Sequence, residues 1–123
     1  MKDPKPRILV VDNEQAFTQL TKLTLTDYEI CEENRSGHAL ETARNFKPDL
    51  ILLDVVMPGL DGGDVAAQLR ADPQLQKVPI VFLTAIVTEM ESTAQPLLGG
   101  YPFISKPVTA ERLVENIEKH LGR

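Results

Sequence analysis

The sequence has only one cysteine, Cys31, among its 123 residues, so no disulfide bond can form within the chain. It has no apolar run long enough to span a bilayer, and residues 1–6 are too polar to form the core of a signal peptide. The net charge of −5 argues against non-specific binding to nucleic acid or to anionic membranes. From the charge and the absence of a long apolar run, we expect a protein that binds neither nucleic acid nor membranes directly. A lone cysteine also suits a reducing compartment, so we expect the protein to be cytoplasmic.

The composition is that of a folded domain. Hydrophobic residues make up 42% of the chain and charged residues 25%, which is the balance of an ordered globular protein. There is no internal repeat, low-complexity tract or interdomain linker, and the length suffices for one hydrophobic core. We therefore expect residues 1–123 to form a single domain.

Short apolar-rich runs alternate with helical patterns along the sequence. Such runs are typical of strands covered on both faces, and they predict strands at residues 8–11, 28–31, 50–53, 80–83 and 103–104. Apolar residues at helical spacing follow in residues 16–23, 39–46, 65–69, 88–98 and 113–121. This alternation predicts an α/β fold with a parallel sheet, helices on both faces and right-handed crossovers.

Local signals refine several of these elements. Thr109 is a predicted N-cap of the last helix, and Pro102 suggests that the fifth strand lies at a sheet edge. Pro96 lacks a backbone donor, so we expect a shortened or irregular last turn in the helix predicted at 88–98. The first helix is rich in threonine, a mediocre helix former, so packing must hold it. Its predicted packing stripe consists of Ala16, Phe17, Leu20 and Leu23.

Polar side chains with chemical capacity follow four of the five predicted strands. Asp54 ends the third strand, and alone it would be read as a cap for the turn that follows. The other three strand ends carry Asp12 with Asn13, then Thr84, and then Lys106. Because the carboxyl ends of parallel strands meet at one edge of a sheet, these side chains are expected to converge. We therefore interpret Asp54 as part of a functional site.

Four motifs make the sequence resemble the receiver domains of two-component response regulators. They are Val11-Asp12-Asn13-Glu14, residues 54–62 (DVVMPGLDG), Leu83-Thr84-Ala85 and Ser105-Lys106-Pro107. The resemblance covers nearly the whole chain, from Arg7 to the last helix. It implies a flavodoxin-like, doubly wound (βα)5 fold whose five-stranded parallel sheet has the order 2-1-3-4-5. It also implies that Asp54 accepts a phosphoryl group from a sensor histidine kinase or a phosphotransfer protein.

The resemblance assigns roles in a Mg²⁺-dependent phosphorylation to these residues. Asp54 would be the carboxylate nucleophile. Lys106 would bind a phosphoryl oxygen as a point charge, and Thr84 would donate its hydroxyl to another. The Mg²⁺ ligands would be Asp12, Asn13, Asp54 and the backbone carbonyl of Val56. The chain would then be a phosphoacceptor that assists its own phosphorylation and dephosphorylation, and not an enzyme acting on a separate substrate.

Asn13 departs from the pattern of the family, in which an acid at this position usually binds the metal directly. An amide oxygen can still coordinate Mg²⁺, but one negative charge is missing. Glu14 would compensate only by turning inward, whereas we expect its side chain to point into the first helix. We therefore predict weaker Mg²⁺ binding without loss of phosphorylation.

Three further positions bear on signalling. By resemblance, phosphorylation draws Thr84 toward the phosphoryl group, and an aromatic residue three positions before the lysine packs into the vacated space. Here that residue is Phe103, which would equally serve as a permanent core residue because it has no hydroxyl to satisfy. The readout surface, also the candidate surface for a homodimer, would comprise the fourth helix, the fifth strand and the last helix. Val56 and Ile86 would flank the path of a hydrolytic water, and because neither can orient it, we expect slow self-dephosphorylation.

Two other functions are compatible with parts of the sequence. A degenerate receiver that acts as a phosphorylation-independent interaction module would fit Asn13 and Phe103, although the intact phosphorylation residues argue against it. An aspartate-nucleophile phosphatase would use Asp12 with Glu14. Such an enzyme requires an acid/base aspartate two residues after the nucleophile, where this sequence has Glu14. It also requires a cap or longer loops to define a substrate site, and the sequence shows no sign of them.

Overall fold

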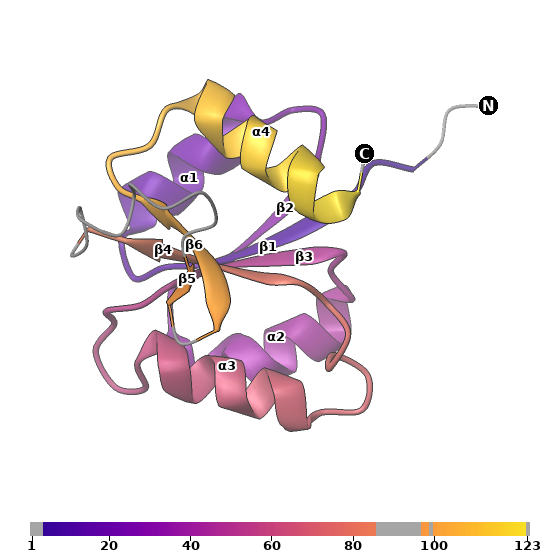
Figure 1. Cartoon of the computed structure of the whole chain (residues 1–123), viewed down its shortest axis with the longest axis vertical. Coiled ribbons are helices and arrows are strands. Elements are labelled where there is room, and N and C mark those ends of the chain that lie inside the picture. The colour runs from indigo at the N-terminus through magenta and orange to yellow at the C-terminus, as the bar shows by residue number, and fades with distance from the viewer. Residues whose placement is uncertain (1–3, 86–96, 99, 123) are drawn as a thin grey trace.

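The computed structural model describes residues 4–85, 97–98 and 100–122. Five parallel strands form the sheet that the alternating sequence pattern predicts (Figure 1). In spatial order they are β2 (Glu29–Glu33), β1 (Arg7–Val11), β3 (Leu50–Asp54), β4 (Ile80–Thr84) and β6 (Tyr101–Ser105). This order corresponds to 2-1-3-4-5 for the five predicted strands, so the predicted flavodoxin-like topology is confirmed.

Helices cover both faces of the sheet, as Figure 1 shows. On one face lie α1 (Gln15–Thr24) and α4 (Ala110–Leu121), and on the other lie α2 (Ala39–Phe46) and α3 (Gly62–Ala71). A short 3-10 helix, η1 (Ser36–His38), precedes α2. Within the described residues, no helix combines the length and the apolar character that crossing a bilayer requires.

The central strands are buried on both sides because helices cover both faces. Side chains alternate along a strand, so Leu9 and Val11 of β1 pack in the layer with α2 and α3, whereas Ile8 and Val10 pack in the layer with α4. All four side chains are fully buried. These two apolar layers hold the strands in place, so that their carboxyl ends form a fixed rim.

The sheet contains a sixth strand where a helix was predicted. β5 (Leu97–Leu98) pairs antiparallel with β6, with Leu97 opposite Pro102. The predicted extension of the fourth helix to residue 98 is therefore wrong at its last two residues, while residues 88–96 lie outside the described residues. Gly100 connects the two strands with a φ of 87°, a left-handed conformation that glycine adopts at low cost. Pro102 thus lies at the edge of the parallel part of the sheet, with β5 beyond it.

The buried face of α1 differs from the predicted apolar stripe. Thr18 and Thr21 are buried, whereas Leu20 and Leu23 are 65% and 70% exposed. The threonines can be buried because their hydroxyls have acceptors. Thr18 Oγ1 donates to Glu32 Oε1 at 3.0 Å, and Thr21 Oγ1 donates to the backbone carbonyl one turn earlier at 2.8 Å. The prediction that Leu20 and Leu23 hold this helix by packing is therefore wrong.

Side chains cap two helices that follow strand ends. Asp61 Oδ1 accepts a hydrogen bond from the Asp64 backbone N–H at 2.9 Å, and Asp64 Oδ2 accepts one from the Asp61 N–H at 3.3 Å. This reciprocal capping box begins α3. Thr109 Oγ1 accepts a hydrogen bond from the Arg112 N–H at 3.1 Å, so the predicted N-cap of the last helix is confirmed.

Asp72 ends α3 with a buried, hydrogen-bonded carboxylate. It accepts hydrogen bonds from Arg44 Nε at 2.5 Å and from the Gln74 backbone N–H at 2.8 Å. The hydrogen bond from Arg44 is the main reason why the pKa of Asp72 lies below its usual 3.8. The ionised Asp72 carboxylate therefore stabilises the folded state. This contribution is complete at pH values above the pKa of the residue in the unfolded state, and it is lost as the pH falls through the lower pKa of the folded state.

We expect Asp72→Asn to lower the melting temperature at neutral pH, because asparagine cannot form the charged hydrogen bond with Arg44. The difference from wild type should shrink as the pH falls below 3.8, where the wild-type carboxylate also becomes protonated. Thermal melts across the pH range measure this, with the exposed Asp27→Asn as the control for loss of one acid. A difference that stayed constant into acid would show that Asp72 contributes through packing alone.

Candidate functional site

The carboxyl ends of four parallel strands bring the predicted site residues to one rim of the sheet. Asp12 follows β1, Asp54 and Thr84 are the last residues of β3 and β4, and Lys106 follows β6. Asp54 lies opposite Leu83 in the register of β3 and β4. The Lys106 backbone N–H donates to the Thr84 carbonyl at 2.8 Å. The sheet itself therefore sets the spacing of these four residues.

The side chain of Lys106 lies among three carboxylates. Its Nζ atom is 2.5 Å from Asp12 Oδ2, 2.9 Å from Glu14 Oε1 and 4.0 Å from Asp54 Oδ2. It also lies 4.6 Å from the centre of the Phe17 ring. Burial alone would lower the pKa of Lys106, but the hydrogen bonds to Asp12 and Glu14 outweigh it and raise that pKa. Lys106 is therefore a fixed positive charge in this pocket.

Asp54 is a buried carboxylate beside another buried carboxylate. Asp12 is fully buried and Asp54 is 7% exposed. Burial, and then the negative charge of Asp12, raise the pKa of Asp54 to about 6 despite the opposing charge of Lys106. The Val56 backbone N–H donates to Asp54 Oδ1 at 3.3 Å. Three carboxylates, those of Asp12, Glu14 and Asp54, surround the single ammonium group of Lys106, so the pocket favours further positive charge.

The loop between β3 and α3 is anchored through Ser36. Ser36 Oγ donates to the Pro58 carbonyl at 3.0 Å and accepts a hydrogen bond from the Leu60 N–H at 3.1 Å. Val56 lies earlier in this loop and is 57% exposed. An apolar side chain therefore faces solvent close to Asp54, at one of the two positions predicted to flank a hydrolytic water.

The remaining predicted positions lie around the carboxylates. Thr84 is buried at the end of β4, and Phe103 is buried in the core layer with α2 and α3. Asn13 is exposed and lines a cavity of about 430 Å³ beside the loop that follows β3. The second position predicted to flank the water, Ile86, lies outside the described residues.

Glu14 is oriented differently from the sequence-based prediction. It is the N-cap residue of α1, yet its side chain makes no capping hydrogen bond and contacts Lys106 instead. Asp12 Oδ1 accepts a hydrogen bond from the Glu14 backbone N–H at 2.9 Å, which holds the turn between β1 and α1. The prediction that Glu14 points into the first helix is therefore wrong. The one signal for it in the sequence was an acid directly after Asp12 and Asn13.

Asp12, Glu14 and Asp54 together can hold a metal ion. One oxygen atom from each residue lies within 4.8 Å of the others, and two of the three residues are buried. The ammonium group of Lys106 already takes the place of a cation between Asp12 and Glu14. Carboxylate oxygens are ligands that Mg²⁺ prefers. The donor set therefore fits a hard divalent cation.

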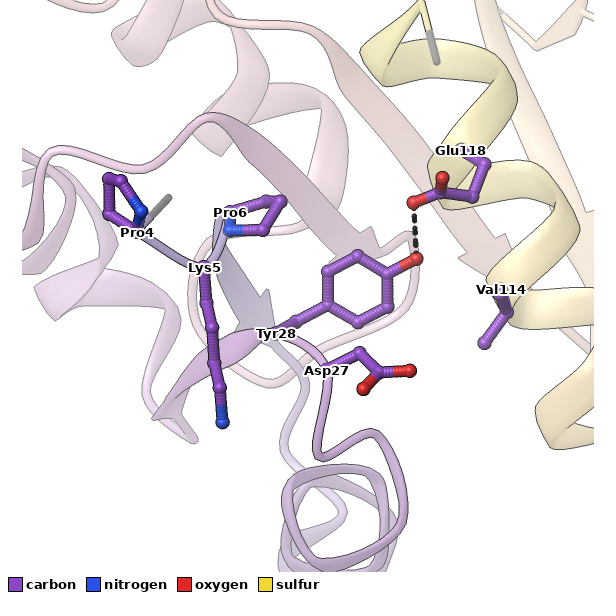
Figure 2. Close-up of a pocket in the computed structure, with 7 residues that line it drawn as sticks. All are labelled: Pro4, Lys5, Pro6, Asp27, Tyr28, Val114 and Glu118. Carbon is purple, nitrogen blue, oxygen red and sulfur yellow. Dashed lines mark hydrogen bonds between the residues drawn. The ribbon is translucent and has the colours of Figure 1, made fainter. Parts of the chain in front are cut away.

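A larger cavity, of about 580 Å³, lies at the opposite rim of the sheet (Figure 2). Residues before β1, at the start of β2 and on α4 line it. In Figure 2 the Tyr28 ring points toward Glu118, and the Tyr28 hydroxyl donates to Glu118 Oε2 at 2.5 Å. This contact ties the start of β2 to α4. The convergent acids and the lysine lie at the other rim, so we place the candidate site there and not in this cavity.

The match to a known family covers most of the chain. A family model described as the response regulator receiver domain matches residues 8–118. The chain belongs to the receiver domains of response regulators. This membership supports a role in phosphorylation-based, two-component signalling, and receiver domains generally act as signalling domains rather than as enzymes.

Relatives and solved structures agree with this family. The polar-differentiation response regulator DivK of Brucella anthropi is 32% identical over 122 residues, which cover 97% of this receiver domain and 98% of DivK. The response regulator PleD of Caulobacter vibrioides is 38% identical over 104 residues, which cover 83% of this chain but 23% of PleD. The structure of the chemotaxis response regulator CheY4 of Vibrio cholerae matches with a TM-score of 0.81 at 25% identity, covering 94% of this chain and 98% of CheY4.

Proposed function

We propose that this receiver domain is a phosphorylation-dependent switch in which Asp54 accepts a phosphoryl group from a histidine kinase or a phosphotransfer protein. One observation carries the proposal. Asp54 is a buried carboxylate at the end of a central strand, with the Lys106 ammonium 4.0 Å away and a second buried acid, Asp12, beside it. A nucleophile, a positive charge and a metal-binding donor set thus occupy one pocket.

In the proposed transfer, a carboxylate oxygen of Asp54 forms a bond to phosphorus while the bond from phosphorus to the donor imidazole nitrogen breaks. The electron pair of that bond stays with the imidazole. Catalysis of such a step requires in-line positioning and neutralisation of the phosphoryl oxygens more than proton transfer. Lys106 would provide one positive charge by turning from the acids toward a phosphoryl oxygen, and Thr84 would donate its hydroxyl to another.

The remaining positive charge would come from Mg²⁺, which neutralises phosphoryl oxygens when it is bound. We propose Asp12, Asn13, Asp54 and the Val56 carbonyl as its ligands. Asp12 is suited to this role because it is fully buried and already accepts a hydrogen bond from a cationic group. Asn13 follows it directly on the same turn between β1 and α1.

We propose that Thr84 and Phe103 transmit the phosphorylated state to the face formed by β6 and α4. Thr84 pairs with Ser105 in the register of β4 and β6, so a shift of Thr84 toward Asp54 would act directly on β6, which also carries Phe103. The same face is the proposed surface for a homodimer. Because the exposed Val56 cannot orient a water, the phosphoryl group should be lost slowly, and the decay of the phosphorylated protein measures its lifetime.

Phosphorylation by a small donor tests this function. Incubation with Mg²⁺ and acetyl phosphate should add one phosphoryl group to the purified protein, as seen by intact-mass spectrometry. Asp54→Ala should remove the gain, and so should EDTA, because the nucleophile or the metal is then missing. Asp27→Ala, an exposed aspartate at the opposite rim, should gain the group normally. No gain in folded wild-type protein would instead favour a phosphorylation-independent interaction module.

A further inference from the structure

Glu14 lies at the mouth of the acidic pocket. Its side chain is 63% exposed, whereas the side chains of Asp12 and Asp54 are 0% and 10% exposed. Its Oε1 atom is 2.9 Å from Lys106 Nζ. One carboxylate oxygen from each of the three acids lies within 4.8 Å of the other two. A cation entering from solvent would therefore meet Glu14 together with the two buried acids.

The neutral side chain at position 13 makes this third acid important. Mg²⁺ is bound most strongly by charged oxygen ligands. With an amide at Asn13, Asp12 and Asp54 would be the charged ligands apart from Glu14, and Asp54 must also serve as the nucleophile. With Glu14, two carboxylates would still hold the cation while Asp54 reacts.

We infer that Glu14 supplies the third carboxylate of the metal site and replaces the charge that Asn13 lacks. The inference rests on the proposed function, because it concerns the Mg²⁺ on which phosphorylation depends. In the present structure Lys106 neutralises Glu14. Glu14 would exchange this hydrogen bond for the cation, and the Lys106 ammonium would then be free to turn toward the phosphoryl oxygens on Asp54.

Calorimetric titration with Mg²⁺ of four proteins tests the inference: wild type, Glu14→Gln, Asn13→Asp and the double variant. Glu14→Gln should weaken Mg²⁺ binding about tenfold or more, a loss typical of removing a group that supports a metal site. Asn13→Asp should restore most of the Mg²⁺ affinity in the Glu14→Gln background. In the wild-type background the same substitution should tighten Mg²⁺ binding by a smaller factor. This non-additivity would show that the two positions supply the same charge. Glu41→Gln, which removes an exposed acid on α2, should bind Mg²⁺ as wild type does.

A role for Glu14 in holding Lys106 alone predicts a different result. Glu14→Gln would then lower the melting temperature in EDTA, while its Mg²⁺ affinity would equal that of wild type. Such a result, alongside normal phosphoryl gain by wild type, would overturn the inference and leave the proposed function standing. If wild type neither bound Mg²⁺ nor gained a phosphoryl group, the inference and the proposed function would both be wrong.

Discussion

Gly62→Ala is expected to melt about 10 °C below the wild type. A Cβ atom at Gly62 would lie 2.6 Å from the Asp54 carbonyl oxygen and 2.8 Å from Val55 Cα. Both contacts are with backbone at the end of β3, so neither can be relieved by a side-chain rotation. The start of α3 must move instead. Overpacking of this kind costs about 3 kcal/mol, which corresponds to about 10 °C in a domain of this length.

Gly63→Ala is a closely matched control, because it adds the same methyl group one residue further along the same helix. A Cβ there would meet Asp61 Oδ1 at 3.3 Å, and a side-chain atom of this kind can move slightly. Alanine is also a better helix former than glycine by up to about 1 kcal/mol. We therefore expect Gly63→Ala to melt at or slightly above the wild-type temperature. Equal melting of the two variants would contradict the close packing of α3 against Asp54.

The same close approach connects stability with the site. The Gly62 backbone N–H donates to the Val55 carbonyl at 2.8 Å, directly after Asp54. A displaced α3 would therefore shift the backbone that positions the phosphoacceptor. At a temperature where both variants are folded, Gly62→Ala should gain a phosphoryl group from acetyl phosphate more slowly than Gly63→Ala, as intact-mass spectrometry would show. Equal rates would mean that α3 does not position Asp54.

The predictions that succeeded rest on patterns that one segment carries by itself. The apolar runs of β1 and β3 predict buried parallel strands because both faces are covered. The convergence of Asp54 and Lys106 then follows from topology, since parallel strands end at the same rim. The cap at Thr109 is equally local, because its side chain binds a backbone N–H three residues later.

The predictions that failed depend on partners in other elements of the fold. Thr18 is buried with the help of an acceptor on β2, Glu32, which helical spacing in α1 does not indicate. Glu14 turns inward toward Lys106, which lies 92 residues later in the chain. Leu97 pairs with Pro102 across a glycine turn, so a strand replaces the predicted end of a helix. In each case a tertiary contact outweighs the local preference of the segment.

Lys106→Met is expected to lower the free energy of unfolding by about 3 kcal/mol in EDTA. Methionine retains an unbranched, flexible side chain but removes the charge, so the buried Asp12 carboxylate loses the ammonium group 2.5 Å away. Loss of one partner from a buried ion pair costs about 3–5 kcal/mol. The lower end applies here because Lys106 is 12% exposed and its second partner, Glu14, is 63% exposed. Urea unfolding measures the change, and the exposed Lys77→Met controls for loss of one positive charge.

Mg²⁺ should reverse part of this loss. In the wild type, a cation that binds Asp12 and Glu14 must displace the hydrogen bonds of Lys106, whereas in Lys106→Met the carboxylates have no such competitor. Binding to the folded state stabilises it according to ligand concentration and affinity, so tenfold tighter binding adds about 1.4 kcal/mol at saturating Mg²⁺. The unfolding free energy of Lys106→Met should therefore rise more with added Mg²⁺ than that of the wild type.

Lys106→Met should nevertheless not be phosphorylated faster, although it binds Mg²⁺ more tightly. The variant lacks the ammonium that would bind a phosphoryl oxygen on Asp54, so its gain of phosphoryl group from acetyl phosphate should be slower than that of wild type even at saturating Mg²⁺. Tighter metal binding with slower phosphorylation would separate the two roles of Lys106, as a neutralising charge before transfer and as a phosphoryl ligand during it. Equal stabilisation of both proteins by Mg²⁺ would show that the lysine and the cation do not compete for the same carboxylates.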